Sequence, residues 1–324
     1  MFGFFSKGRT EVGRVEGSGK VPALGDFVRT PSPSGEMMAF ERWLTRAMET
    51  GEARLGSAWK SAFAAGAPHA FVWSGTLEKK TRGLLAGVVV PSTDSVGRSF
   101  PVVICAPVPL AAFGANAHLA PLVLHEFFQL AAAAAVRAVR TRSQAEFHAQ
   151  VSSVPSPSLD GMAAALTRYG AWTKSLLPSQ LWASVFGEDA ERATRSALYL
   201  VMESTSTYRG QEAPPLSLGL RVPLATDTPA SAALWLDVVR TAAGWKTTVP
   251  TLFIPLAAVP RALILLGAEA PTSVLADLYV PTADSNAVCD LTSASPKLPA
   301  DLPSAVMRAA ESTSLPDVVA ALGR

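Results

Sequence analysis

Three consecutive apolar runs place the strongest limit on how this chain can fold. They are HAFVWSGTL at residues 69–77, RGLLAGVVVPS at residues 82–92 and SFPVVICAPVPL at residues 99–110. Each is rich in Val, Phe or Leu, and the last two are separated by the turn-forming segment STDSVGR. Helical patterns lie on both sides of these runs in the sequence. This order predicts an α+β fold in which an antiparallel sheet carries helices on one face.

The flanking helices are predicted from apolar spacing. Residues 35–56, GEMMAFERWLTRAMETGEARLG, repeat apolar side chains at helical intervals, and residues 58–66 predict a second short helix. A long helix is expected from Leu119 to Val151. Its apolar stretch is interrupted by His125, Glu126 and Gln129, so a buried core helix is favoured over a membrane span.

The Pro- and Ser-rich segment SSVPSPSLDG, residues 152–161, predicts a domain boundary. We expect a lead segment at 1–16, an N-terminal α/β domain at 17–152, and a second mixed α/β domain at 153–292. A Pro/Ser-rich tail with short helices follows at 293–324. VVVPSTDSVGR at 88–98 is echoed by DLYVPTADSNA at 277–287, which leaves two readings open: a second domain of related fold, or a common turn device.

Composition argues against several classes of function. Charged residues make up 17% of the chain, the net charge is +2, and Lys and Arg form no long cluster, so a nucleic-acid partner is not expected. The two cysteines lie far apart, which fits a reducing compartment, and the first residues lack the pattern of a signal peptide. We therefore expect a cytoplasmic protein without an integral membrane segment.

The segment GSGKVPALGDFVRT, residues 17–30, superficially resembles a phosphate-binding loop. Such a loop needs a glycine five residues before the Gly-Lys pair and a Ser or Thr after it. Arg14 and Val21 occupy those two positions, and Pro22 disfavours a helix at Val21. Nucleotide or phosphate binding is therefore not predicted for this segment.

Other catalytic and metal patterns are also missing from the sequence. No Gly-X-Ser-X-Gly motif is present, and His118 and His125, which could share a helix face, lack further ligands at helical spacing. We predict no catalytic residue, cofactor or metal. The remaining polar candidates are Asp26, Asp94 and Arg98, which could either lock a loop by pairing or bind a ligand.

Two motifs resemble those of the TagF family, also called ImpM. The first, GKVPALGDF, contributes Gly19, Lys20, Pro22, Gly25, Asp26 and Phe27. The second, VPSTDSVGRSFP, contributes Pro91, Ser92, Asp94, Val96, Gly97, Arg98, Phe100 and Pro101. The aromatic helix FERWLTRAM between them is similar too. The second half resembles the longer family members more loosely, so the likeness spans roughly residues 17–291, while the lead and tail depart from it.

The resemblance implies a regulator of bacterial type VI secretion rather than an enzyme. Family members act after translation and in the cytoplasm, through the forkhead-associated scaffold protein of the secretion system. The expected partners are type VI components, with a location at most peripheral to the machine at the inner membrane. The resemblance assigns no catalytic residues, and whether the protein represses or activates, and its oligomeric state, stay open.

Two hypotheses about these residues follow. In the first, the chain is a regulatory binding protein in which Asp26 pairs with Arg98, Phe27 enters the core, and Asp26→Ala lowers stability. In the second, Asp26, Asp94 and Arg98 form a site for a nucleotide or another small ligand, or a cryptic hydrolase site, which would need a concave pocket with convergent polar groups.

Overall fold

The computed structural model describes residues 11–74, 83–211, 218–256, 261–267, 270–280, 286–292 and 298–323. In these residues, nine strands form one sheet in the order β2-β1-β5-β4-β3-β7-β8-β6-β9. The strands are β1 (Glu16–Gly19), β2 (Val28–Arg29), β3 (His69–Trp73), β4 (Gly83–Val90), β5 (Val102–Pro109), β6 (Gly219–Pro223), β7 (Thr251–Pro255), β8 (Arg261–Leu265) and β9 (Val288–Asp290).

The strand pairing confirms the predicted α+β class. Every neighbouring pair runs antiparallel except β6 and β9, which are parallel. The three apolar runs become β3, β4 and β5, which lie side by side because short connections favour antiparallel neighbours.

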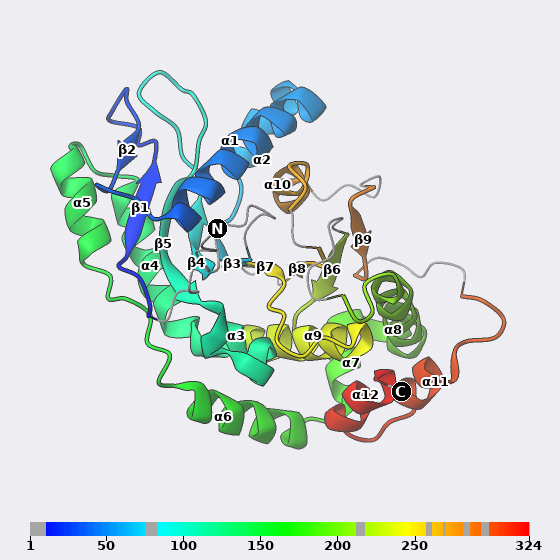
Figure 1. Cartoon of the computed structure of the whole chain (residues 1–324). Helices are drawn as coiled ribbons and strands as arrows, with labels where there is room; N and C mark the ends of the chain where they lie inside the picture. Colours follow the sequence, from blue (N-terminus) through cyan, green and yellow to red (C-terminus); the bar gives the residue numbers. More distant parts are fainter. Residues whose placement is uncertain are drawn as a thin grey trace, which may run out of the picture.

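Helices cover both faces of the sheet (Figure 1), so the expectation of a single covered face is wrong. On one face lie α1 (Gly35–Leu55), α2 (Ser57–Ala64) and α10 (Val274–Tyr279). On the other lie α3 (Ala120–Val123), α4 (His125–Ala138) and α9 (Thr228–Ala243). Every residue of β3, β4 and β5 is buried, which is expected of strands with a hydrophobic core on each side.

The long helix predicted from Leu119 to Val151 is also wrong. The chain forms a 3₁₀ segment (Gly114–Leu119), then α3 and α4, and restarts as α5 (Gln144–Ser152). Ser143 caps α5 by accepting a hydrogen bond from the Glu146 N–H, and the Glu146 carboxylate accepts one from the Arg142 N–H. Ser143 and Glu146 have the spacing of a capping box, a signal that the sequence contained.

The second half of the chain adds a further helical layer. Its remaining helices are α6 (Met162–Ser175), α7 (Pro178–Phe186), α8 (Ala190–Ser206), α11 (Ser304–Ala310) and α12 (Leu315–Leu322). The two tail helices are packed into the fold: α11 against α8, and α12 against α9 and α6. Residues 281–285, within the segment that echoes residues 88–98, lie outside the described residues.

The sheet runs without interruption from one half of the sequence to the other. β3 pairs with β7 from His69–Pro255 to Val72–Leu252, and Trp43 on α1 donates its Nε1–H to the Ala270 carbonyl at 2.8 Å. The predicted boundary at 152–161 falls in the loop between α5 and α6. The division into two domains stays a prediction.

Among the described helices, no single one is long and apolar enough to cross a membrane. The segments Gly114–Val123 and His125–Ala138 reach the required length and composition only as a pair bent by 42°.

Candidate functional site

The two family-like motifs meet at the buried side chain of Asp94, in the turn between β4 and β5. Its Oδ1 accepts hydrogen bonds from the backbone N–H groups of Val96 at 3.1 Å and Arg98 at 2.8 Å. Its Oδ2 lies 2.6 Å from Nε of Arg98 and 3.1 Å from Nζ of Lys20. We call Lys20, Asp94 and Arg98 the Asp94 clasp.

The clasp keeps Asp94 ionised. Burial alone would raise the pKa of this carboxyl, but the Arg98 N–H, the Lys20 ammonium, the Arg98 guanidinium and the Val96 N–H outweigh that effect. Together they hold the pKa of Asp94 well below its usual range. At neutral pH the group is an anion whose two oxygens are already occupied, so it is poorly suited to act as a general base.

The clasp also ties the first motif to the second. Arg98 donates from a terminal nitrogen to the Gly25 carbonyl at 2.7 Å, and the Ser95 N–H donates to the Leu24 carbonyl at 3.0 Å. Pro22 lies at the surface of the intervening turn, which the Leu24 N–H closes by donating to the Val21 carbonyl. Two loops about 70 residues apart in sequence are thereby held as one surface.

Two glycines of the motifs are required by the backbone. Gly19 has φ of 147°, and a Cβ there would lie 2.4 Å from the Pro101 carbonyl oxygen, because β1 approaches the start of β5 closely. Gly97 has φ of 81°, and its N–H closes the turn by donating a hydrogen bond to the Asp94 carbonyl. These positions explain why the motif needs glycine without invoking phosphate.

The pairing of Asp26 and the burial of Phe27 differ from what the sequence predicted. Arg98 pairs with Asp94 and not with Asp26, which is exposed and has no hydrogen bond or ion pair to any described residue. Phe27 does not enter the core: it is 36% exposed and packs edge-on against Phe100, with ring centroids 4.9 Å apart. The guanidinium of Arg29 lies 5.6 Å from the Phe27 ring centroid.

The remaining residues of the second motif shape the turn. The Ser92 carbonyl accepts a hydrogen bond from the Phe100 N–H at 3.0 Å, and Phe100 is buried. Pro91 directly follows β4. At the tip, Val96 is 70% exposed. The turn between β4 and β5 therefore carries the exposed apolar side chain of Val96 at its tip, and Phe27 packs near its base. The hydrogen bonds of the Asp94 clasp hold the backbone of this turn in place.

The histidines do not form a metal site. His118 lies in the 3₁₀ segment and His125 begins α4, so they do not share a helix, and burial is the main cause that lowers the pKa of each. His69 is buried, and His148 contacts the Arg29 carbonyl at 2.8 Å. In the part of the chain that the structure describes, no three His, Cys, Asp or Glu side chains lie close enough to hold a metal ion.

A second buried ionic network was not predicted. Arg221 on β6 lies 2.7 Å from the Asp290 carboxylate and donates to the Asp277 carbonyl, while Arg54 on α1 pairs with the Asp277 side chain at 2.9 Å. Thr292 and Arg221 oppose burial and lower the pKa of Asp290. The sequence feature that could have indicated this network is Arg221, a charged residue inside the otherwise apolar strand sequence LRVP. The network connects α1, α10 and β6, which indicates a structural role.

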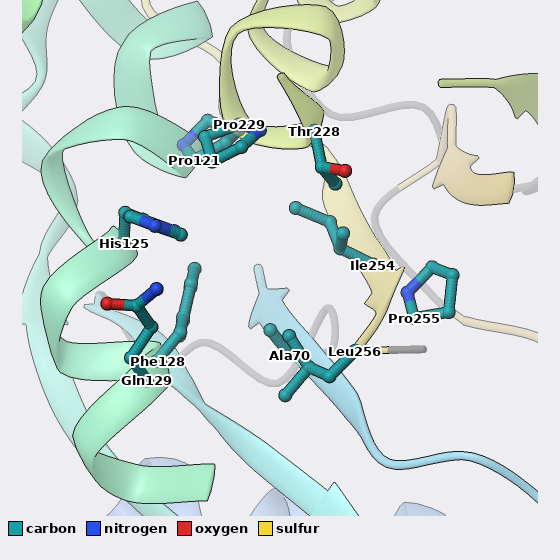
Figure 2. Close-up of a pocket in the computed structure, with 10 residues that line it drawn as sticks. All are labelled: Ala70, Pro121, His125, Phe128, Gln129, Thr228, Pro229, Ile254, Pro255 and Leu256. Atoms are coloured by element: carbon teal, nitrogen blue, oxygen red, sulfur yellow. The ribbon is translucent and has the colours of Figure 1, made fainter. Parts of the chain in front are cut away.

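A pocket lies between α3, α4, the start of α9 and the ends of β3 and β7 (Figure 2). None of its lining residues belongs to the Asp94 clasp. Its volume is about 330 Å³. The lining residues are Ala70, Pro121, His125, Phe128, Gln129, Thr228, Pro229, Ile254, Pro255 and Leu256. No local sequence pattern indicates this pocket, because its walls come from four separate segments.

Comparison with known proteins identifies the N-terminal part of this fold. Residues 18–154, which contain both motifs and the clasp, match the family model of the TagF N-terminal domain, described as type VI secretion system-associated. Residues 18–154 form a TagF N-terminal domain. The TagF domain contributes the strands β2, β1, β5, β4 and β3 of the shared sheet.

The crystal structure of PA0076 from Pseudomonas aeruginosa PAO1 aligns with this chain at a TM-score of 0.48 and 17% identity, covering 88% of this chain and 100% of that one. No curated protein matches the sequence significantly.

Proposed function

We propose that this TagF protein is a non-enzymatic regulator of a bacterial type VI secretion system, and that it acts after translation by binding one protein component of that system. The type VI association of its N-terminal domain carries this proposal. The family resemblance makes the forkhead-associated scaffold protein the expected partner. The place of action would be the cytoplasm, at most peripheral to the machine at the inner membrane.

The Asp94 clasp supports binding rather than catalysis. Its carboxylate accepts four hydrogen bonds or ion pairs from within the chain, and its guanidinium is shared between Asp94 and the Gly25 carbonyl. A catalytic group needs an atom free to meet the substrate. The alternative of a ligand-responsive or hydrolytic cluster loses support, because Asp26 lies outside the clasp and is unpaired among the described residues.

The same geometry provides a surface for a protein partner. Val96 is 70% exposed and Phe27 is 36% exposed on loops that the clasp joins. Because these loops are already ordered, binding through them costs less conformational entropy than binding through a loose segment. An apolar surface on a partner could cover both side chains when it binds.

Affinity capture from the bacterium that carries this chain tests the proposal. The full-length wild-type chain should recover a type VI secretion component, and Val96→Glu should lose most of it. Leu166→Glu on α6 is the matched control, because Leu166 is also apolar and 48% exposed. Arg98→Ala, which loosens the clasp, should weaken capture as well. Wild-type capture that contains no type VI component would contradict the proposed function.

A further inference from the structure

We infer that the pocket between α4 and α9 binds an uncharged amphipathic small molecule, with an apolar body and a head group that both donates and accepts hydrogen bonds. A volume of about 330 Å³ lies within the range of small-molecule sites, which are mostly apolar with a few polar groups. This site is separate from the Asp94 clasp and does not depend on the proposed function.

Three prolines contribute to the apolar wall of the pocket. Pro121, Pro229 and Pro255 surround the space together with Phe128 and Ile254 (Figure 2). Proline has no backbone N–H, so these walls expose no donor that would need a partner. Its ring is also rigid, so these three residues lose little side-chain freedom when a ligand binds.

Three polar side chains lie in the lining. His125, Gln129 and Thr228 have no side-chain hydrogen bond to any described residue. Figure 2 shows the His125 ring pointing from α4 into the space, with the Gln129 amide beside it. Because Gln129 follows His125 by four residues, both lie on one face of α4 and can reach the same head group.

We assign an uncharged head group because none of the lining residues that the structure describes is Asp, Glu, Lys or Arg. Burial and the nearby Arg168 lower the pKa of His125 while Asp227 raises it, and the net lowering leaves the ring neutral at pH 7. Arg168 and Asp227 compensate each other at 3.0 Å. An ionised head would give up part of its hydration here without gaining an opposite charge from the lining.

The start of α9 does not offer an anion site. Asp227 caps this helix by accepting a hydrogen bond from the Ala230 N–H at 3.3 Å, and the Thr228 N–H donates to the Thr226 carbonyl at 2.9 Å. Pro229 has no N–H to donate. The first turn is therefore already satisfied, which favours an amide or hydroxyl head over a carboxylate.

Three probes with the same six-carbon chain test this assignment on the full-length protein: hexanamide, hexanoate and hexylamine. Binding is followed by saturation-transfer NMR titration at pH 7. Hexanamide should bind saturably with a Kd on the order of 1 mM. Hexanoate and protonated hexylamine should bind at least about tenfold more weakly.

Variants locate the site. His125→Leu and Gln129→Leu each remove one hydrogen-bonding group without emptying the pocket, and each should weaken hexanamide binding about threefold to tenfold. Gln144→Leu, at an exposed position on α5, is the matched control and should leave the Kd unchanged. No saturable binding of hexanamide, equal binding of all three probes, or equal loss in Gln144→Leu would each overturn the inference.

Discussion

At the residue scale, Asp94 and Asp26 can be compared directly, because both are aspartates in adjoining loops but differ in burial and pairing. Asp94 is buried and pairs with Lys20 and Arg98, whereas Asp26 is exposed and unpaired among the described residues. Asp94→Asn should lower the melting temperature, because two cations lose their anion. Asp26→Asn should leave the melting temperature unchanged within experimental error. This outcome differs from the expectation, based on the sequence, that loss of the Asp26 carboxylate lowers stability. Differential scanning calorimetry of both variants measures the two melting temperatures. Equal values for Asp94→Asn and Asp26→Asn would contradict a stabilising role for the Asp94 clasp.

The same carboxylate predicts how stability responds to acid. The pKa of Asp94 is below its ordinary value of 3.8 in the folded chain, so the unfolded chain takes up a proton first as the pH falls. The contribution of Asp94 is complete above the unfolded value and is lost between that value and the lower folded pKa. Urea titrations between pH 6 and pH 3 should therefore show a shallower acid loss in Asp94→Asn than in the wild type.

His69 predicts a second pH effect, at less acidic pH. Burial lowers its pKa from 6.5 to about 4, although its ring contacts the Ala67 carbonyl at 2.9 Å. Below pH 6.5 the unfolded chain binds a proton that the folded chain does not, so stability falls by up to about 3 kcal/mol as the pH approaches 4. His69→Asn does not titrate. Urea denaturation at pH 7.5, 6 and 5 should give a flatter profile for it, and parallel profiles would count against a buried neutral His69.

At the element scale, two glycines should respond oppositely to the same substitution. Gly19 ends β1 with a positive φ and has no room for a Cβ beside Pro101, so Gly19→Ala should destabilise by at least about 1 kcal/mol. Gly170 lies inside α6, where a Cβ would meet nothing within 4 Å. Gly170→Ala should stabilise by about 0.5–1 kcal/mol, because alanine is the better helix former. Denaturant unfolding measures both, and a stable Gly19→Ala would contradict the close approach of β1 to β5.

The C-terminal helices give the other prediction at this scale. Leu315 begins α12 and is fully buried in the core that includes α9, whereas the sequence predicted a Pro/Ser-rich tail with short helices. Leu315→Ala should cost about 2–5 kcal/mol of unfolding free energy, as expected for a buried leucine. Leu177→Ala is the control: Leu177 is 54% exposed, and its loss should change stability by no more than about 0.5 kcal/mol. Equal effects would show that α12 is not part of the core.

The strands were more predictable than the helix boundaries, for a local reason. Residues 69–73, 83–90 and 102–109 are continuous apolar runs between turn formers, so their type follows from the run itself. The break between α4 and α5 depends on one cap at Ser143 within an otherwise helical pattern. A helical period is compatible with either one helix or several, so it could not decide between them.

At the scale of the whole molecule, the shared sheet predicts a single unfolding transition. β3 and β7 pair directly, and Trp43 on α1 packs against Phe253 with ring centroids 6.0 Å apart. Neither half can lose these contacts without exposing the core of the other. Thermal unfolding followed by far-UV circular dichroism and by tryptophan fluorescence should give coincident curves. Two separated transitions would instead favour two independent domains.

The sequence alone determined the α+β class, the central strands and the two motifs of the TagF N-terminal domain, because each depends on neighbouring residues or on a fixed local pattern. Only the tertiary structure decided that Asp94, and not Asp26, binds Arg98. Both acidic residues lie in turns rich in glycine, and which one is buried depends on how β1 meets β5. The pocket at His125 was decided in the same way, since α4, α9 and β7 contribute its walls and nothing local links them.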